Sequence, residues 1–190
     1  MLILASSSPY RRQLLERLRL PFAICAPHVD ESAHSGESGR ETALRLAQAK
    51  AQAVAPHYPQ DLIIGSDQVA MLDAAPLGKP GGPEAALTQL RLVRGHPVRF
   101  HTALCLLDAS TGRSQIEDVA TLVRFRDYTD AQAARYLELD EPYDCAGSAK
   151  IEALGVALVD RVESDDPTAL IGLPLIALVS MLQRAGVEVL

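Results

Sequence analysis

Near its N-terminus the chain reads Leu2-Ile3-Leu4-Ala5-Ser6-Ser7-Ser8-Pro9-Tyr10-Arg11-Arg12. The first four of these residues are apolar and predict a buried strand, and Ser8 followed by Pro9 is typical of a helix cap with proline at the first helical position. We expect that helix to run to about Arg19. Arg11 and Arg12 fall in its first turn, beside N–H groups that have no partner within a helix, so the segment predicts an anion-binding site.

The rest of the chain alternates between strand and helix patterns. Further strands are expected at residues 22–25, 62–65, 98–107, 115–125 and 155–159, and further helices at 41–54, 83–93, 129–139 and 174–184. No repeat or long linker divides the sequence. We therefore predict an α/β protein with a single domain over residues 1–190, a length that suits one compact core.

Composition limits the classes of function. The formal net charge of -6 argues against general nucleic-acid binding, which needs a basic face. The sequence contains neither a signal-peptide core nor an apolar run long enough for a membrane span, so we expect no membrane partner. Its three cysteines form no CxxC pair, which fits a reducing cytoplasm rather than a disulfide framework or a zinc site.

Lysine is rare in this chain. Of 18 basic residues only Lys50, Lys79 and Lys150 are lysines. A compact ammonium meets a phosphate as a point charge in a way that arginine's planar fork does not, so these three are candidate phosphate ligands; the alternative is chance in an arginine-rich composition. Lys50 falls on the apolar face of the helix expected at 41–54, where it could reach out to water or point into a pocket.

Two carboxylates are candidates for metal binding and catalysis. Asp67 follows the strand expected at 62–65, and open α/β sheets place their chemistry where buried strands end. Glu31 lies in a polar loop over residues 26–39. Mg²⁺ is bound in phosphate sites through one or two carboxylates plus substrate oxygens. The alternative for Asp67 is a turn aspartate that accepts a local N–H bond.

Several ordered segments together resemble the Maf family of nucleoside triphosphate pyrophosphatases over essentially the whole length. These segments are Leu4-Ala5-Ser6-Ser7-Ser8-Pro9-Tyr10-Arg11-Arg12, Val29-Asp30-Glu31, Ala47-Gln48-Ala49-Lys50-Ala51, Gly65-Ser66-Asp67-Gln68-Val69, Gly78-Lys79-Pro80, Cys145-Ala146-Gly147 and Gly172-Leu173-Pro174. The resemblance implies an elongated mixed β-sheet flanked by helices, related to inosine triphosphate pyrophosphatases, and a homodimer. It also implies metal-dependent hydrolysis, with Mg²⁺ or Mn²⁺, of a small-molecule nucleoside triphosphate to the monophosphate and pyrophosphate.

The resemblance also implies roles for individual residues. Asp67 matches the proton acceptor of the family, and Glu31 together with Asp67 would hold the metal. A carboxylate that ligates a metal is a poor base, so activation of the water by the metal is an equally physical account. The phosphates would be gripped by Ser6, Arg11, Arg12, Lys50 and Lys79.

The base is expected to be chosen by Tyr10, Gln68 and Glu152, which resemble the branch of the family acting on 7-methyl-GTP more than the branch acting on dTTP and UTP. Methylation at N7 makes guanine cationic, so an aromatic ring gains a cation-π interaction and a carboxylate offsets the charge. Tyrosine replaces the commoner tryptophan, and Ala149 and Ala153 replace a usual aromatic and a usual glycine, which leaves the shape of the pocket open. The alternatives are a helix-surface Tyr10 and a solvated Glu152, with dTTP, UTP or a broader set of modified nucleotides as substrates.

Two other functions compete with hydrolysis. A non-catalytic, nucleotide-binding regulator of septum formation would need neither Asp67 nor Glu31, whereas hydrolysis needs both. A nucleotidyltransferase would resemble LxxGxGxR loops, and Ser6-Ser7-Ser8 lacks those glycines.

Overall fold

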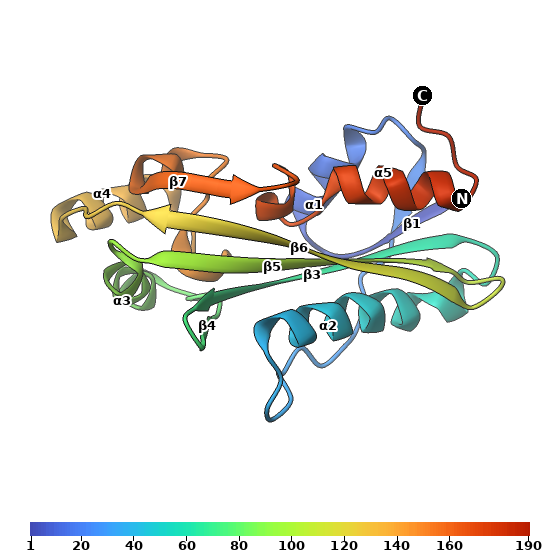
Figure 1. Cartoon of the computed structure of the whole chain (residues 1–190), viewed down its shortest axis with the longest axis horizontal. Helices are drawn as coiled ribbons and strands as arrows, with labels where there is room; N and C mark the ends of the chain where they lie inside the picture. Colours follow the sequence, from blue (N-terminus) through green and yellow to red (C-terminus); the bar gives the residue numbers. More distant parts are fainter. The chain divides into compact units, whose positions relative to one another are not determined.

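The computed structural model describes residues 1–190 and contains one mixed sheet. Its seven strands are β1 (Leu2–Ala5), β2 (Phe22–Ile24), β3 (Leu62–Leu72), β4 (Ala75–Leu77), β5 (Pro97–Asp108), β6 (Arg113–Phe125) and β7 (Val159–Ser164). They are ordered β2-β1-β3-β5-β6-β7, and β4 pairs with β3 (Figure 1). Strand β1 runs parallel to β2 and β3, whereas the β3–β4 and β6–β7 pairs are antiparallel. The predicted α/β class with a mixed sheet flanked by helices is confirmed.

Five α-helices and four short 3₁₀ helices accompany the sheet. The α-helices are α1 (Pro9–Glu16), α2 (Gly39–Val54), α3 (Pro83–Val93), α4 (Asp130–Asp140) and α5 (Leu175–Arg184). The 3₁₀ helices are η1 (Ala55–His57), η2 (Ala146–Ser148), η3 (Leu154–Leu158) and η4 (Ala169–Ile171). No helix combines the length and the apolar character that crossing a bilayer requires.

Contacts divide the chain into two compact units, which are described separately. The first unit contains residues 1–68, 102–119 and 166–190, and the second contains residues 69–101 and 120–165. The expectation of one domain over residues 1–190 stays a prediction.

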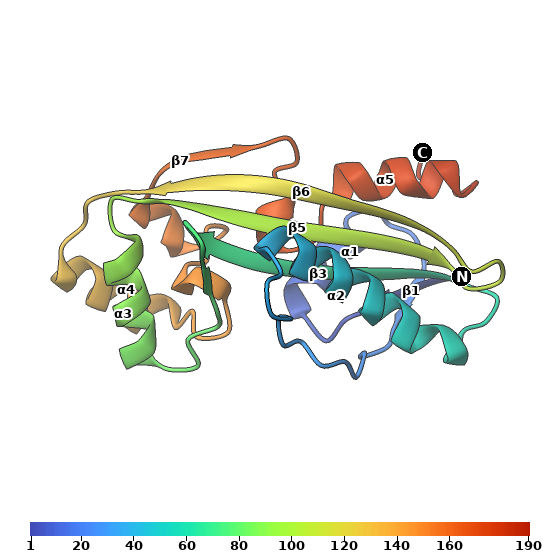
Figure 2. The same ribbon diagram turned by 60° about the horizontal axis from the view of Figure 1, so that its bottom comes forward.

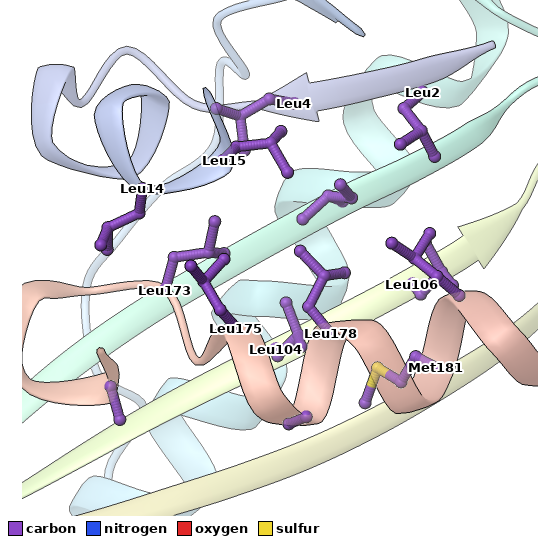
Figure 3. Packing of buried hydrophobic residues seen from close by; sticks show 14 of the residues in the cluster. Leu2, Leu4, Leu14, Leu15, Leu104, Leu106, Leu173, Leu175, Leu178 and Met181 are labelled. Carbon is purple, nitrogen blue, oxygen red and sulfur yellow. The ribbon is translucent and has the colours of Figure 1, made fainter. Parts of the chain in front are cut away.

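The core of the first unit follows from strand alternation. Leu2 and Leu4 of β1 point to the face covered by α1 and α5, where they meet leucines such as Leu14 and Leu178 (Figure 3). The intervening Ile3 is equally buried on the opposite face. Figures 1 and 2 show α2 on the side of these strands away from α5. Burial on both faces explains why β1 is continuously apolar rather than alternating.

The second unit contains the end of β3, all of β4 and β7, the start of β5, the end of β6, and the two helices α3 and α4. Helix α3 packs against α4 and η2, and α4 also packs against η3. Thr129 and Gln132 form the expected capping box at the start of α4. Strands β6 and β7 pair from Thr121 opposite Ser164 onward, with an irregularity at Arg124 and Phe125.

Strand β3 differs from the prediction, because it continues through Asp67 instead of ending before it. Polar residues can remain inside a buried strand when their side chains find partners. Ser66 and Gln68 point to one face and Asp67 to the other, and all three side chains are hydrogen-bonded. The expectation that Asp67 marks a strand end, or a turn, is therefore wrong.

Two other element boundaries were predicted incorrectly. Helix α1 ends at Glu16 rather than near Arg19, because the next three N–H groups bond to carbonyls three residues earlier and Arg19 takes a left-handed φ of 55°. The strand expected at 155–159 begins only at Val159. The preceding residues form η3 (Leu154–Leu158) instead, in which Gly155 packs so closely against Lys150 that a Cβ would lie 2.5 Å from the Lys150 carbonyl oxygen.

Gly65 sets the distance between β3 and α2, which gives the first testable prediction. A Cβ at this position would lie 2.1 Å from the carbonyl oxygen of Ala47 and 2.9 Å from the nitrogen of Ala51. Gly65→Ala is expected to lower the free energy of unfolding by about 3 kcal/mol, because helix backbone cannot yield to the methyl group as a side chain can. Urea denaturation measures the effect.

Gly82→Ala is the matched control, since a Cβ there meets nothing within 4 Å and φ is -171°. We expect this control to change stability by no more than about 0.5 kcal/mol. Equal stabilities of the two variants would contradict the close approach of α2 to β3.

Candidate active site

A buried lysine joins the two predicted acidic residues. Lys50 on α2 places Nζ 2.6 Å from Oδ1 of Asp67 and 2.6 Å from Oε1 of Glu31. The side chains of Lys50 and Asp67 are only 7% and 9% exposed, whereas that of Glu31 is 56% exposed. Of the two orientations that the sequence leaves open for Lys50, the structure shows the inward one, with the ammonium bonded to two carboxylates.

The alternation of β3 explains why Asp67 meets Lys50. Residues 65 and 67 share the face that α2 covers, and the missing side chain of Gly65 lets the helix approach the strand. Lys50 occupies the buried face of α2 together with Ala43, Ala47 and Ala51. Small neighbours on that face leave a path for the long lysine side chain toward the strand.

The electrostatics of Asp67 reflect both burial and its neighbours. Desolvation raises the pKa of Asp67 above its ordinary value, and the charge of Glu31 adds to this effect. The charge and hydrogen bond of Lys50, followed by the charge of Arg11, act in the opposite direction. Burial prevails, so Asp67 is a stronger base than an ordinary aspartate.

Arg11 adds a second positive charge to this group. Its Nε donates to the carbonyl oxygen of Gly172 at 2.8 Å, and Ser66 Oγ donates to the same oxygen at 2.9 Å. Desolvation lowers the pKa of Arg11, while the charges of Asp67 and Glu31 oppose that shift. One carbonyl thus orients both Arg11 and a neighbour of Asp67.

Gln68 is engaged with the protein itself. Its Nε2 donates to Thr102 Oγ1 at 2.9 Å, and it also contacts the carbonyl oxygens of Ala169 and Leu170 at 3.1 and 3.0 Å. These bonds use the amide nitrogen of the side chain. The side chain of Gln68 is thereby tied to the segment that carries Ala169 and Leu170.

The start of α1 has fewer unbonded N–H groups than the sequence predicts. Ser8 accepts the N–H of Arg11 on its hydroxyl and the N–H of Arg12 on its carbonyl, and Ser6 Oγ accepts the N–H of Ser8. Two first-turn N–H groups are therefore already bonded. Among the side chains predicted to bind an anion at this helix start, Ser6 is buried and Arg12 is exposed beside Glu16.

The remaining predicted residues are divided between the units. Tyr10 is a partly buried residue of α1 in the first unit. Lys79 and Glu152 belong to the second unit, where both are exposed. Partial desolvation raises the pKa of Glu152, and Asp140 and Asp144 add to the shift while Lys150 opposes it.

The third lysine has a structural partner. Lys150 Nζ lies 3.1 Å from the carbonyl oxygen of Asp140 and 3.5 Å from that of Glu141, at the C-terminal end of α4. A cation is favourable at a helix C-terminus, so this contact accounts for the charge of Lys150.

Comparison with known proteins identifies the chain. The family model described as "Maf-like protein" matches residues 1–185. The chain belongs to the Maf family. Its similar relatives in Cupriavidus pinatubonensis, Ralstonia nicotianae and Thiobacillus denitrificans are each named "7-methyl-GTP pyrophosphatase".

These Maf relatives align over nearly their full length. The Cupriavidus protein is 61% identical, over 97% of this chain and 93% of its own. The Ralstonia protein is 60% identical, over 96% and 94%. The Thiobacillus protein is 58% identical, over 100% and 94%. A solved structure, "The structure of the Staphylococcus aureus Ham1 protein", is 14% identical with a TM-score of 0.47, covering 66% of this chain and 72% of that one. At that score the likeness supports no conclusion about function.

The donor set of this Maf chain fits a hard divalent cation. The carboxylates of Glu31 and Asp67 meet at one cationic group, so both can face a single positive charge. The chain has no cluster of three or more His, Cys, Asp or Glu side chains suited to a metal. A Mg²⁺ or Mn²⁺ ion would therefore depend on these two carboxylates and on oxygens of the substrate.

Sequence reasoning missed the residues that hold the loop of Glu31. Arg45 on α2 bonds to Glu37 through Nε at 2.5 Å and to the carbonyl oxygen of Ser32 at 2.9 Å. The hydrogen bond to Arg45 lowers the pKa of Glu37 to about 2. The sequence offers no signal for this contact, because Arg45 lies beside the buried face of α2 and its position does not reveal its partner. Ser66 and Gly172 lie in the quoted family segments, but the sequence alone assigned them no contact.

Removal of the buried ammonium is expected to destabilise the protein in a pH-dependent way. Lys50→Met should cost about 3 kcal/mol at neutral pH, because it leaves Asp67 buried without its nearest countercharge. Between the ordinary and the raised pKa of Asp67, the folded state binds more protons than the unfolded state, so stability falls as pH rises through that window. Lys50 acts to lower this pKa, so its loss extends the window to higher pH.

Chemical denaturation in metal-free buffer from acidic to neutral pH measures this effect. The stability difference between wild type and Lys50→Met should grow as pH rises. Lys79→Met, at an exposed position, is the control and should follow the wild type. A penalty for Lys50→Met that is the same at every pH would show that its loss acts through packing and not through Asp67.

Proposed function

We propose that this chain hydrolyses 7-methyl-GTP between its α- and β-phosphates, giving 7-methyl-GMP and pyrophosphate, with Mg²⁺ or Mn²⁺. The observation that carries the proposal is the buried Lys50–Asp67 pair, joined by Glu31 and flanked by Arg11, in a chain of the Maf family. The names of relatives up to 61% identical support the choice of substrate.

Charge neutralisation is the first contribution of these residues. Phosphoanhydride cleavage is mainly a matter of positioning and of stabilising charge on the phosphate oxygens. Arg11 is partly buried and held by Gly172, so its guanidinium is oriented before a substrate arrives. In this proposal Ser6, Arg12, Lys50 and Lys79 contact further phosphate oxygens, and Lys50 also keeps the two carboxylates directed to one point.

Asp67 supplies the base in the proposed reaction. A water oxygen bonds to the α-phosphorus, its proton passes to the Asp67 carboxylate, and the bridging oxygen leaves with pyrophosphate. Burial raises the pKa of Asp67, which brings its basicity closer to the operating pH. A divalent cation held at Glu31 would offset the phosphate charge and polarise the P–O bonds, and where Asp67 also ligates the cation, the metal and not Asp67 would activate the water.

Recognition of the methylated base is assigned to Tyr10 and Glu152. The ring of Tyr10 offers a stacking face for a cationic base, and Glu152 offers a countercharge. Gln68 is assigned an indirect role, since its amide group is bonded to Thr102 and to backbone carbonyls. We also propose, from the family alone, a cytoplasmic homodimer in which residues 1–190 act as one enzymatic domain.

A nucleotide panel tests the proposed substrate. Pyrophosphate release would be measured from 7-methyl-GTP, GTP, dTTP and UTP with Mg²⁺ or Mn²⁺, and with EDTA as the metal-free control. We expect the highest kcat/KM for 7-methyl-GTP and no release in EDTA. Glu152→Gln should reduce the preference for 7-methyl-GTP over GTP by about tenfold, the scale of one charge-assisted hydrogen bond.

A preference for dTTP or UTP in that panel would refute the substrate. Absence of turnover with every nucleotide and metal would instead favour a nucleotide-binding regulator.

Asp67→Asn tests the catalytic assignment. The change removes the proton acceptor and half of the carboxylate pair while keeping the shape of the side chain. Turnover should be abolished, whereas nucleotide affinity, measured by calorimetry, should stay within about tenfold of wild type. Asp61→Asn is the control, because Asp61 pairs with the N-terminal ammonium and not with the site residues. Wild-type rates in Asp67→Asn would exclude Asp67 from the chemistry.

A further inference from the structure

A buried carboxylate outside the site described above holds the start of α5. Asp166 is only 2% exposed, and its Oδ2 accepts the N–H groups of Ile176 and Ala177 at 2.7 and 3.4 Å. These N–H groups belong to the first turn of α5, where Pro174 at the cap position offers no side-chain bond. A negative charge is favourable at a helix N-terminus, so Asp166 caps α5 from a preceding segment of the chain.

Thr168 closes the same segment into a loop. Its N–H and hydroxyl lie 3.0 and 2.7 Å from Asp166 Oδ1, and its Oγ1 accepts the N–H of Leu175 at 2.8 Å. Oγ1 is also 2.9 Å from the carbonyl oxygen of Leu173. We call Asp166 and Thr168 the clasp, because together they tie both ends of residues 169–172 to each other.

The loop that the clasp closes presents carbonyl groups to the candidate site. The Gly172 oxygen accepts from Arg11 and from Ser66. The Ala169 oxygen accepts from Gln68 and, at 2.9 Å, from Thr102. Ser66 and Gln68 are the two residues that flank Asp67, so the loop holds the strand on both sides of that carboxylate.

We propose that the Asp166–Thr168 clasp is a positioning device for the reaction: it fixes residues 169–172 so that their carbonyls set the placement of Asp67 and Arg11. The clasp is linked to Asp67 and Arg11 through the carbonyls of Ala169 and Gly172. The inference rests on the proposed function, because positioning matters only if Asp67 and Arg11 act on a substrate. A displacement of the reacting groups by about 1 Å can lower the rate by about a hundredfold.

The clasp also stabilises α5, so the test must separate positioning from stability. Thr168→Val removes the hydroxyl at nearly constant shape. Thr129→Val makes the same change at the cap of α4, where the hydroxyl accepts an N–H in the same way but lies outside this loop. The two variants would be compared by melting temperature and by kcat and KM for 7-methyl-GTP.

We expect Thr168→Val to lower kcat by about tenfold or more, with KM within about threefold, because the loss falls on the placement of Asp67. Thr129→Val should keep kcat within about twofold at a similar loss of melting temperature. Thr168→Ser, which restores the hydroxyl, should recover the rate. Equal effects of Thr168→Val and Thr129→Val on kcat would overturn the proposal.

Two further measurements keep the test decisive. If Thr168→Val does not fold, Thr102→Val releases the same loop from its other side by removing the bond to Ala169 together with the bond from Gln68. An unchanged kcat there would overturn the proposal. If the wild type hydrolyses no nucleotide, the proposed function fails by itself. Amide hydrogen exchange then tests the clasp. Residues 62–72 should exchange faster in Thr168→Val, or in Thr102→Val if Thr168→Val does not fold, than in Thr129→Val. Unchanged exchange of these residues would overturn the proposal.

Discussion

Asp67 is a carboxylate inside a buried strand, and the chain must provide it with a countercharge. Lys50 does so from the neighbouring helix at 2.6 Å. The pairing requires α2 to lie close to β3, which the absent side chain of Gly65 permits. Glu31 reaches the same ammonium from a loop that Arg45 ties to the helix. Strand, helix and loop are thus arranged around one short ion pair.

Because side chains alternate along β3, the residues beside Asp67 are held by contacts on the opposite face of the strand. The residues on either side of Asp67 point away from α2 and bond to the segment 169–172. The carboxylate is therefore held by its own partner on one face and by its neighbours' partners on the other. Such a strand can carry three consecutive polar residues without breaking, because none of their side chains is left unsatisfied.

The parts of the fold that depend on local pattern were predictable. The strand at residues 2–5, the Ser8 cap and the capping box of α4 follow from neighbouring residues, and the structure contains each of them. The length of β3 was not predictable in this way, because the partners of Ser66 and Gln68 come from residues about a hundred positions later in the chain.

In the candidate site, too, local features could be predicted and long-range contacts could not. Rarity of lysine and position on an apolar helix face singled out Lys50, and a carboxylate after apolar residues singled out Asp67. Neither signal could show that the two would pair, since pairing depends on the spacing of helix and strand. The contact between Arg11 and Gly172 joins residues at opposite ends of the chain, and only the folded arrangement reveals it.

The engagement of Gln68 has a consequence for redesign. Its amide nitrogen is shared among Thr102, Ala169 and Leu170, so a different residue at position 68 would change which carbonyls of that loop are held, and where. Given the role proposed for Gln68, substrate preference would depend on residue 68 together with the loop that it anchors. An attempt to transfer a new nucleotide preference should therefore exchange the loop together with residue 68, because a new side chain alone would lack the backbone carbonyls that hold it in place.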